Sequence, residues 1–329
     1  MTSVPLAARS STAGNLRPLN ILRDLPRVAD LIELCFANSM DSEGHSYVQQ
    51  MRRASRDSSF MRWANSAIEN ASMPLSGFVW EQDGRIVGNA SLVPFRYKGK
   101  RICLVANVAT HPNYRRQGIA RALTERTMQH ARQRGTHELW LHVRKDNPGA
   151  IQMYADLGFV ERAHRTTWRI SSKGPQSAAS DSTLSLPTVT KRYSRFWPQQ
   201  LAWLNLLHPK EIGWYRNINW NNLKPGLWNW FYRIFVEFDL HQWAVQKNGK
   251  LQGVLSWVPT LHSTPLWLAC DMQADNDSIA TLLLRAHRDL GYRRSLTIEH
   301  PTGLQEDAFL LAGFSVVRTL IWMQARGAT

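Results

Sequence analysis

The spacing of apolar residues in the first half of the chain predicts alternating helices and strands. A helical stretch begins near Asp24, which is available as its N-cap, and repeats apolar side chains every three or four positions: Leu25, Val28, Leu31, Ile32 and Cys35. Apolar, β-branched runs at 77–95 and 100–110 predict strands, and the Asp-Gly pair at 83–84 predicts a hairpin turn. A helix at 122–135, a strand at 138–144, a helix at 150–158 and a strand at 159–170 follow. This order predicts an α/β fold with a central mixed sheet flanked by helices.

The second half repeats this order in register. Residues 243–259 align with 78–94, so that Gly84 falls on Gly249 and Gly88 on Gly253. Residues 306–317 align with 151–162, and Gly158 falls on Gly313. An internal duplication therefore predicts two copies of one fold.

The chain divides at a segment of linker composition. Residues 171–187 are rich in Ser, Ala, Pro and Gly and have no apolar periodicity, which is typical of a surface linker. We therefore expect domains at 17–170 and 188–326. Residues 1–16 predict a short disordered tail, with a transit peptide as the alternative, because the segment lacks the long apolar core of a secretory signal.

The amino-acid composition bears on the solubility, the cellular location and the ligands of the protein. Of 329 residues 43% are hydrophobic, and no run approaches the roughly 20 apolar residues that span a bilayer, which predicts a soluble protein. Three widely separated cysteines outside any CxxC spacing argue against a disulfide framework and a structural zinc. We expect a cytoplasmic protein without a metal. The formal charge of +15 attracts polyanions, which include nucleic acid, anionic lipid and phosphorylated ligands, and does not choose among them.

The strongest chemical signal is a loop that suits a phosphate. Residues 112–120, PNYRRQGIA, connect the strand at 100–110 to a helix. Unpaired N–H groups at the helix start and the positive end of its dipole favour a pyrophosphate. Gly118 and Ala120 are small enough for close approach, and Arg115, Arg116 and Arg121 add positive charge.

Two patterns make this first copy resemble the GNAT superfamily of N-acetyltransferases over about 150 residues. The phosphate-loop pattern of that family, Arg or Gln, two residues, Gly, one residue, Gly or Ala, is met by Arg115, Gly118 and Ala120. Its later pattern is met by Asn147, Ala150, Tyr154, Gly158 and Phe159. The resemblance implies two tandem GNAT folds, with acetyl-CoA or another acyl-CoA as the donor and an amine as the acceptor.

The resemblance also implies roles for individual residues. Asn147 would hydrogen-bond the pantetheine arm, and Tyr154 would give a proton to the departing sulfur. The strand residues Val108, Ala109 and Thr110 would offer backbone groups to the pantetheine and the thioester. The pyrophosphate would be held by the loop and helix start, which comprise Arg115, Arg116, Gln117, Gly118, Ile119, Ala120 and Arg121.

A general base for the acceptor amine is less well marked. His142 aligns with a glutamate that some members acetylating protein N-termini carry, and histidine titrates near neutrality. The alternative is a strand histidine that faces solvent or a core partner. His111 and His45 are weaker candidates, and Asp41 and Glu43 are either amine-attracting groups or a solvated loop.

The second copy has lost the residues that carry this chemistry. Tyr154 aligns with Phe309 and Asn147 with Thr302, and the loop before the second helix holds Asp271, Asp275 and Asp277 without an arginine. Carboxylates cap helices well but repel a pyrophosphate at the same place. We therefore expect a degenerate second domain without a CoA cradle, and one active site per chain.

Ten of the fourteen tryptophans follow the linker. These large rings either build a core and an interdomain interface, or cover the first domain and help to form the acceptor pocket. Tryptophan and tyrosine side chains also suit contact with a membrane surface or stacking on nucleic-acid bases.

The sequence thus predicts an N-acetyltransferase. Acetyl transfer would proceed by direct attack in a ternary complex on a primary amine, either a protein N-terminus, a lysine or a small amine. The alternatives are a non-catalytic acyl-CoA sensor and a basic protein associated with RNA or the ribosome, although no nucleic-acid-binding module accompanies the charge.

Overall fold

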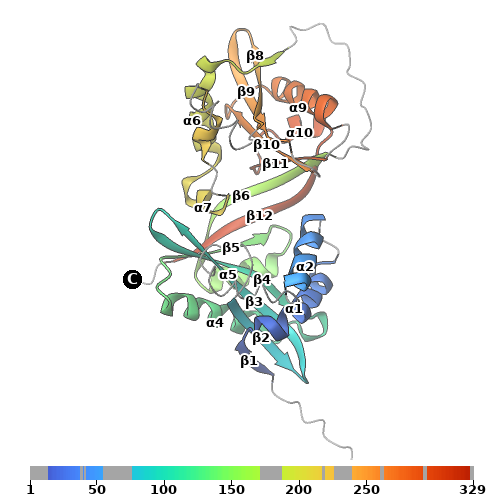
Figure 1. Cartoon of the computed structure of the whole chain (residues 1–329), viewed down its shortest axis with the longest axis vertical. Helices are drawn as coiled ribbons and strands as arrows, with labels where there is room; N and C mark the ends of the chain where they lie inside the picture. The colour runs from blue at the N-terminus through green and yellow to red at the C-terminus, as the bar shows by residue number, and fades with distance from the viewer. Residues whose placement is uncertain are drawn as a thin grey trace, which may run out of the picture. The chain divides into compact units, whose positions relative to one another are not determined.

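The first repeat contains the strands and helices that its hydrophobic pattern predicts, together with two elements that it does not predict, a strand at Asn15–Pro18 and a helix at Ser42–Ala54 (Figure 1). Its elements are β1 (Asn15–Pro18), α1 (Ile21–Phe36), α2 (Ser42–Ala54), β2 (Ser76–Gln82), β3 (Arg85–Tyr97), β4 (Lys100–Thr110), η2 (Pro112–Tyr114), α4 (Ile119–Gln133), β5 (Glu138–Arg144), α5 (Pro148–Asp156) and β6 (Phe159–Ile170).

The second repeat follows the same plan, with a different helical segment after its first strand. Its elements are β7 (Thr188–Lys191), η3 (Ser194–Phe196), α6 (Trp197–Leu207), η4 (Lys210–Ile212), α7 (Gly213–Arg216), η5 (Trp220–Leu223), β8 (His241–Lys247), β9 (Lys250–Trp257), β10 (Ser263–Cys270), α9 (Asn276–Leu290), β11 (Ser295–Pro301), α10 (Glu306–Leu311) and β12 (Ser315–Ala325).

The computed structural model describes residues 14–37, 40, 42–54, 76–170, 187–216, 219–225, 239–259, 263–291 and 295–326. The predicted tail lies outside the described residues up to position 13, and β1 begins within it at Asn15. The predicted linker lies outside them except for Pro187.

Helix α1 begins earlier than the sequence pattern predicts. Its N-cap is Asn20, whose side chain accepts a hydrogen bond from the Arg23 N–H, so the expectation that Asp24 is the cap is wrong. Asp24 instead accepts the Asn20 N–H at 2.8 Å and binds Arg17 at 2.6 Å, and the pKa of its carboxyl lies below the ordinary value because these bonds outweigh the effect of burial. The Asn20 and Asp24 side chains thus each accept a backbone N–H at the helix start, whereas a single capping side chain would leave one of these N–H groups without an acceptor.

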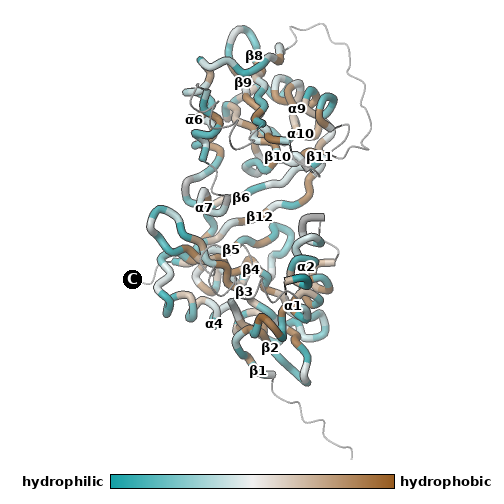
Figure 2. Tube along the Cα trace, viewed as in Figure 1, coloured by the Kyte–Doolittle hydropathy of each residue, from teal (hydrophilic) through white to brown (hydrophobic). Residues whose placement is uncertain are grey.

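In the first unit two helical layers cover opposite faces of the strands. Successive residues of a strand point to opposite faces. Phe78 and Val87 pack with Ile119 and Leu123 of α4, whereas their neighbours on the same strands pack with α1 and α2. The candidate loop therefore lies at the start of a helix that is fixed to one face. Figure 2 shows the hydrophobic residues concentrated along the strands and the helix faces that cover them.

Backbone geometry confirms the duplication. Asp83 and Gly84 have φ values of 51° and 72°, and the matching Asn248 and Gly249 have 52° and 75°. The strand before each turn also shifts register at the matching place, between Trp80 and Glu81 and again between Val245 and Gln246. The two repeats therefore form the same bulged hairpin. Equal strand lengths and similar hydrophobic patterns alone would not require a bulge at the same position.

The closing strands of the two repeats are exchanged. The sheet order is β1-β2-β3-β4-β5-β12-β6-β11-β10-β9-β8-β7, so β5 has the last strand of the other repeat as its neighbour. In the second unit, β6 pairs with β11 in an antiparallel register from Ile170 and Leu296 to Arg165 and Pro301. Each repeat thus supplies a strand that completes the sheet beside the other repeat's helix–strand core.

The division of the chain into two units follows this exchange. The first unit comprises 1–142, 149–160 and 323–329, and the second comprises 143–148 and 161–322. Within the first unit the Arg326 N–H donates to the Gly158 carbonyl at 3.0 Å. Each unit by itself therefore contains segments of both sequence repeats.

Large rings fill the core of the second unit, with α6 on one side of strands β8–β10 and α9 with α10 on the other (Figure 1). Trp197, Trp203 and Trp257 are buried in this cluster. The residues 226–238, with two further tryptophans, lie outside the described part of the chain. The tryptophans of the described segment therefore contribute to packing inside their own unit.

A buried histidine makes the second unit sensitive to acid. His300 is completely buried, and burial lowers its pKa from 6.5 to about 3. Below pH 6.5 the unfolded chain takes up a proton that the folded chain excludes, so stability is complete above pH 6.5 and falls by about 1.4 kcal/mol per pH unit toward pH 3. Urea unfolding between pH 4.5 and 7.5 measures this slope. We expect His300→Leu to flatten it, whereas the exposed-site variant His164→Gln should retain it.

The described residues contain neither a membrane-spanning helix nor a metal-binding cluster. Within the ranges given above, no helix is long and apolar enough to cross a membrane. No group of three or more His, Cys, Asp or Glu side chains is placed there to hold a metal ion.

Candidate functional site

The loop before α4 has a backbone shape that suits an anion. Arg116 and Gly118 both have positive φ, 63° and 77°, and Gly118 is the left-handed N-cap of α4. Successive N–H groups in such turns line a concave surface that favours negative charge. A Cβ atom built on Gly118 would meet no atom within 4 Å, so the space above the loop is open.

The N–H groups of this loop are not used within the protein. None of the described residues accepts a hydrogen bond from the backbone N–H groups of 116–121, and the first helical bond runs from Ala122 to the Gly118 carbonyl. Gly118 has no side chain with which to cap them. Helix starts usually satisfy these donors with a side chain, as Asn20 does in α1. Here they remain available to a ligand, together with the positive end of the helix dipole.

The three arginines of the loop differ in what their side chains contact. Arg115 folds back, and its Nε donates to the Thr110 carbonyl at 3.3 Å. Arg121 binds Asp156 at 3.1 Å. Arg116 is exposed and makes no side-chain contact with the other described residues. Arg116 is therefore the arginine of this loop whose guanidinium is not already engaged.

Strands β4 and β5 separate beside the loop. Their parallel pairing runs from Ile102 and Glu138 to Val105 and Leu141 and stops there, although β4 continues to Thr110. Val108 and Ala109 therefore have no strand partner on the β5 side. The Thr110 carbonyl is engaged by Arg115 and lies 3.2 Å from the Sγ of Cys35.

A bulge in β4 marks the point of separation, and the sequence patterns did not identify it. Asn107 has a φ of 53°, and the register with β3 shifts between Asn89 and Ser91. The buried Asn89 side chain donates to the Asn107 carbonyl at 2.8 Å, and Asn107 donates to the Tyr47 hydroxyl of α2 at 2.7 Å. An asparagine inside a β-branched run was the available signal, because asparagine tolerates positive φ.

Close packing positions the start of α4 against β3. A Cβ atom on Gly88 would lie 2.7 Å from Ile119 and 2.8 Å from Leu123. The same relation exists between Gly253 and Ile279 in the second unit, at 2.8 Å. Glycine at this strand position therefore lets the helix approach the sheet.

Tyr154 lies on α5 and is buried, with 6% of its surface exposed. Its ring contacts Phe159 edge to face, with centroids 6.0 Å apart. None of the described residues forms a hydrogen bond with its hydroxyl. Burial raises the pKa of Tyr154 well above the ordinary value of 10, so the phenol is protonated at neutral pH.

The three histidine candidates occupy different positions. His142 is half-buried on β5, one residue beyond the last pair with β4, where the two strands separate. His111 caps η2 by accepting the Asn113 N–H at 3.3 Å and contacts the Tyr114 ring. His45 is exposed on α2. Asp41 and the Glu43 side chain lie outside the described residues.

Asn147 lies in the turn between β5 and α5, where its N–H donates to the Arg144 carbonyl at 3.1 Å. It belongs to the second unit, whereas the loop and Tyr154 belong to the first. Its approach to the pantetheine arm therefore stays a prediction.

The corresponding positions of the second unit are arranged differently. The Asp275 side chain caps α9 by accepting the Ser278 N–H at 3.0 Å, and it also binds Lys247 at 3.0 Å. Strand β10 pairs with β9 without a register shift, so the bulge of β4 has no counterpart. Phe309 keeps the edge-to-face contact with Phe314, again at 6.0 Å. The second repeat thus keeps the packing of the first while its helix start is occupied by a carboxylate.

Residues 39–159 match the family model described as the acetyltransferase (GNAT) family. The chain is 40% identical over 72 residues to a [ribosomal protein bS18]-alanine N-acetyltransferase of Escherichia coli K12, covering 22% of this chain and 49% of that protein. It is 35% identical over 112 residues to a mycothiol acetyltransferase of Saccharomonospora viridis, covering 34% and 35% of the two chains. The chain therefore spans about half the length, or less, of these curated relatives.

Two solved structures share the fold over nearly the whole chain. A tandem GNAT protein from the clavulanic acid biosynthesis pathway aligns with a TM-score of 0.51 at 16% identity, covering 96% of this chain and 100% of that one. A GCN5-related N-acetyltransferase from Sphaerobacter thermophilus aligns with a TM-score of 0.56 at 13% identity, covering 96% and 97%. The sequence duplication predicted two tandem folds of this kind, and residues 39–159 of the chain belong to the acetyltransferase (GNAT) family.

Proposed function

We propose that the first unit is an N-acetyltransferase that moves an acetyl group from acetyl-CoA to a primary amine. The observation that carries the proposal is the run of unused N–H groups at 116–121, beside a strand that has lost its neighbour. The loop suits a pyrophosphate, and the free edge of β4 suits an extended arm with amide groups. An acyl-CoA has both parts in this order and supplies the activated acetyl thioester.

The residues of the loop bind and orient the donor. The N–H groups of 116–121 hold the pyrophosphate, and the exposed Arg116 adds charge at the rim. The backbone edge at Val108 and Ala109 fixes the pantetheine arm beside β5. Asn147, from the turn after β5, hydrogen-bonds the same arm.

Two side chains transfer protons in the proposed reaction. His142, at the separation of β4 and β5, accepts a proton from the acceptor ammonium, so that the free amine attacks directly in a ternary complex. Tyr154 has no hydrogen-bond acceptor among the described residues and stays protonated, so it gives its proton to the departing sulfur.

Replacing Tyr154 with Phe tests the proton-donor role. The ring is fully accommodated by packing against Phe159, so Tyr154→Phe should keep the fold and acyl-CoA affinity. Turnover should fall at least about tenfold, because general-acid catalysis is typically worth about 10²–10⁴-fold. Release of free thiol, followed with a panel of amines, measures it.

The control for this experiment is Phe159→Leu, which changes the same ring contact but leaves the Tyr154 hydroxyl group in place. Turnover that is unchanged in Tyr154→Phe would remove the assignment. Acyl-CoA binding without thiol release from the unmodified protein with any amine would favour a non-catalytic sensor instead.

The acceptor is proposed as a class. One relative is named for an alanine of a ribosomal protein and another for mycothiol, so the matched segment occurs in enzymes with different amine acceptors. Acceptor loops are the variable part of a shared fold. We propose a protein N-terminus, a lysine or a small amine as the acceptor and the cytoplasm as the location. We also propose that the second unit binds no CoA, because the Asp275 carboxylate caps the helix start at which a pyrophosphate would bind.

A further inference from the structure

A small cavity in the second unit is lined by aromatic rings and a carboxylate. Its walls include the rings of His208, Tyr215, Trp220 and Trp322 and the side chain of Glu299. These residues come from the end of α6, from α7, η5 and β12, and from β11. All of them lie inside the second unit, so the cavity is a feature of that unit by itself.

The rings form two contacting pairs. Tyr215 and Trp322 have centroids 4.8 Å apart at an interplanar angle of 63°, and His208 and Trp220 have centroids 4.8 Å apart at 47°. Trp322 is 2% exposed, whereas Tyr215 is 39% exposed. The ring lining therefore extends from the core of the unit to its surface.

A buried arginine fixes the polar wall of the cavity. Arg165 is 2% exposed; its Nε donates to Glu299 Oε1 and its Nη2 to His208 Nδ1, both at 3.2 Å. The guanidinium can only donate in this contact, so Nδ1 of His208 serves as the acceptor. Arg165 does not line the cavity, and it forms an ion pair with Glu299, the acidic residue of the wall.

We propose that this ring-lined cavity binds the alkylammonium group of a small cationic amine. Ring faces attract cations, and because Glu299 is already paired with Arg165, the rings supply the attraction. The cavity has a volume of about 50 Å³, several times the roughly 10–15 Å³ that one water needs. It therefore takes a head group of a few heavy atoms and not a nucleotide. The lining residues belong to the second unit, and binding there does not depend on acetyl transfer.

The test uses the full-length protein and two probes of similar shape. Tetramethylammonium chloride and the uncharged tert-butanol are titrated at constant ionic strength, and binding is followed by saturation-transfer NMR. We expect tetramethylammonium to bind at least about tenfold more tightly, because only the cation gains from the ring faces. Equal affinity for tert-butanol would identify a merely apolar cavity and overturn the proposal, as would no detectable binding of the cation.

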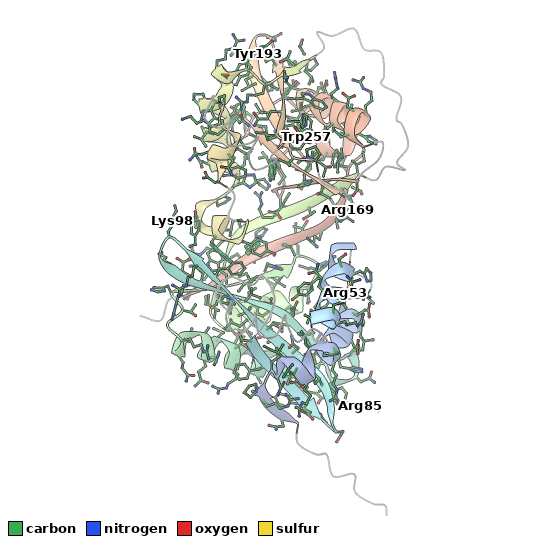
Figure 3. All side chains as sticks on the ribbon, viewed as in Figure 1. Arg53, Arg85, Lys98, Arg169, Tyr193 and Trp257 are labelled. Atoms are coloured by element: carbon green, nitrogen blue, oxygen red, sulfur yellow. The ribbon has the colours of Figure 1, made fainter. Side chains whose placement is uncertain are left out.

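Two matched tyrosine variants locate the site. Tyr215→Leu should weaken tetramethylammonium binding about fivefold, within the range for loss of one cation–ring contact. Tyr193 is 50% exposed and lies near the ends of β7 and β8, away from α7 (Figures 1 and 3), so Tyr193→Leu should leave binding unchanged. Trp220→Leu serves as a second cavity variant. Equal loss in Tyr193→Leu, or no loss in either cavity variant, would overturn the assignment.

Discussion

Gly118→Glu is expected to weaken acyl-CoA binding at least about 100-fold while the protein stays folded. The Cβ position at Gly118 is open, so the substitution adds the backbone strain of a φ of 77° without a clash at Cβ. The new carboxylate shares the space in which we place the pyrophosphate. Two unit charges about 4 Å apart repel by about 4 kcal/mol at an effective dielectric constant near 20, and about 1.4 kcal/mol is tenfold in affinity. Isothermal titration with acetyl-CoA measures the change.

Gly84→Glu is a matched control for this substitution. Gly84 has a φ of 72° and, like Gly118, no atom within 4 Å of its Cβ position. It lies in the β2–β3 turn next to Arg85 (Figure 3), outside residues 116–121 and four positions before Gly88, against which Ile119 packs. Both variants therefore carry the same backbone strain and the same new charge. If both weaken acetyl-CoA binding equally, or neither does, the assignment of residues 116–121 as the cradle fails.

Deletion of residues 315–329 should unfold the first unit as well as the second, although the first unit's candidate loop lies some 200 positions away in sequence. The deletion removes β12, the strand that follows β5 in the sheet order. It also removes three side chains that are each at least 96% buried, Ile321 and Trp322 of the second unit and Met323 of the first. Loss of such side chains costs about 2–5 kcal/mol each, which together equals the usual net stability of about 5–15 kcal/mol.

Circular dichroism, thermal unfolding and acetyl-CoA titration of the shortened chain measure this effect. The control is a shorter deletion after Arg326, which keeps the hydrogen bond from Arg326 to Gly158. That variant should melt and bind like the full chain. A chain ending at residue 314 that still binds acetyl-CoA with full affinity would show that the first repeat completes its own sheet.

The sequence predicts the local elements of the site well, because they depend on neighbouring residues. Strand, loop and helix around Gly118 follow from apolar runs and from a glycine at a helix start. The hairpin at Asp83 and Gly84 and its second copy follow from turn chemistry. These predictions need no knowledge of distant contacts.

Features that depend on distant partners could not be predicted in this way. Strands β6 and β12 both carry a run of consecutive buried residues near their C-terminal ends, so the pattern does not say which of them lies beside β5. The engagement of Arg115 by the Thr110 carbonyl and of Arg121 by Asp156 depends on side-chain geometry. The Asn107 bulge depends on Asn89 and Tyr47, which are respectively 18 and 60 positions away.

The exchanged strands also bear on how such a chain evolves. If the two repeats folded as separate domains, a repeat that had lost its donor site could be removed by a single deletion without harm to the other. Here the same deletion would remove β12 from beside β5, so selection for the first repeat's chemistry also preserves the second repeat's closing strand. If the donor site belongs to the first repeat, as we propose, the second repeat is retained because its last strand lies beside β5, and its other surfaces, including the ring-lined cavity, can acquire a separate use.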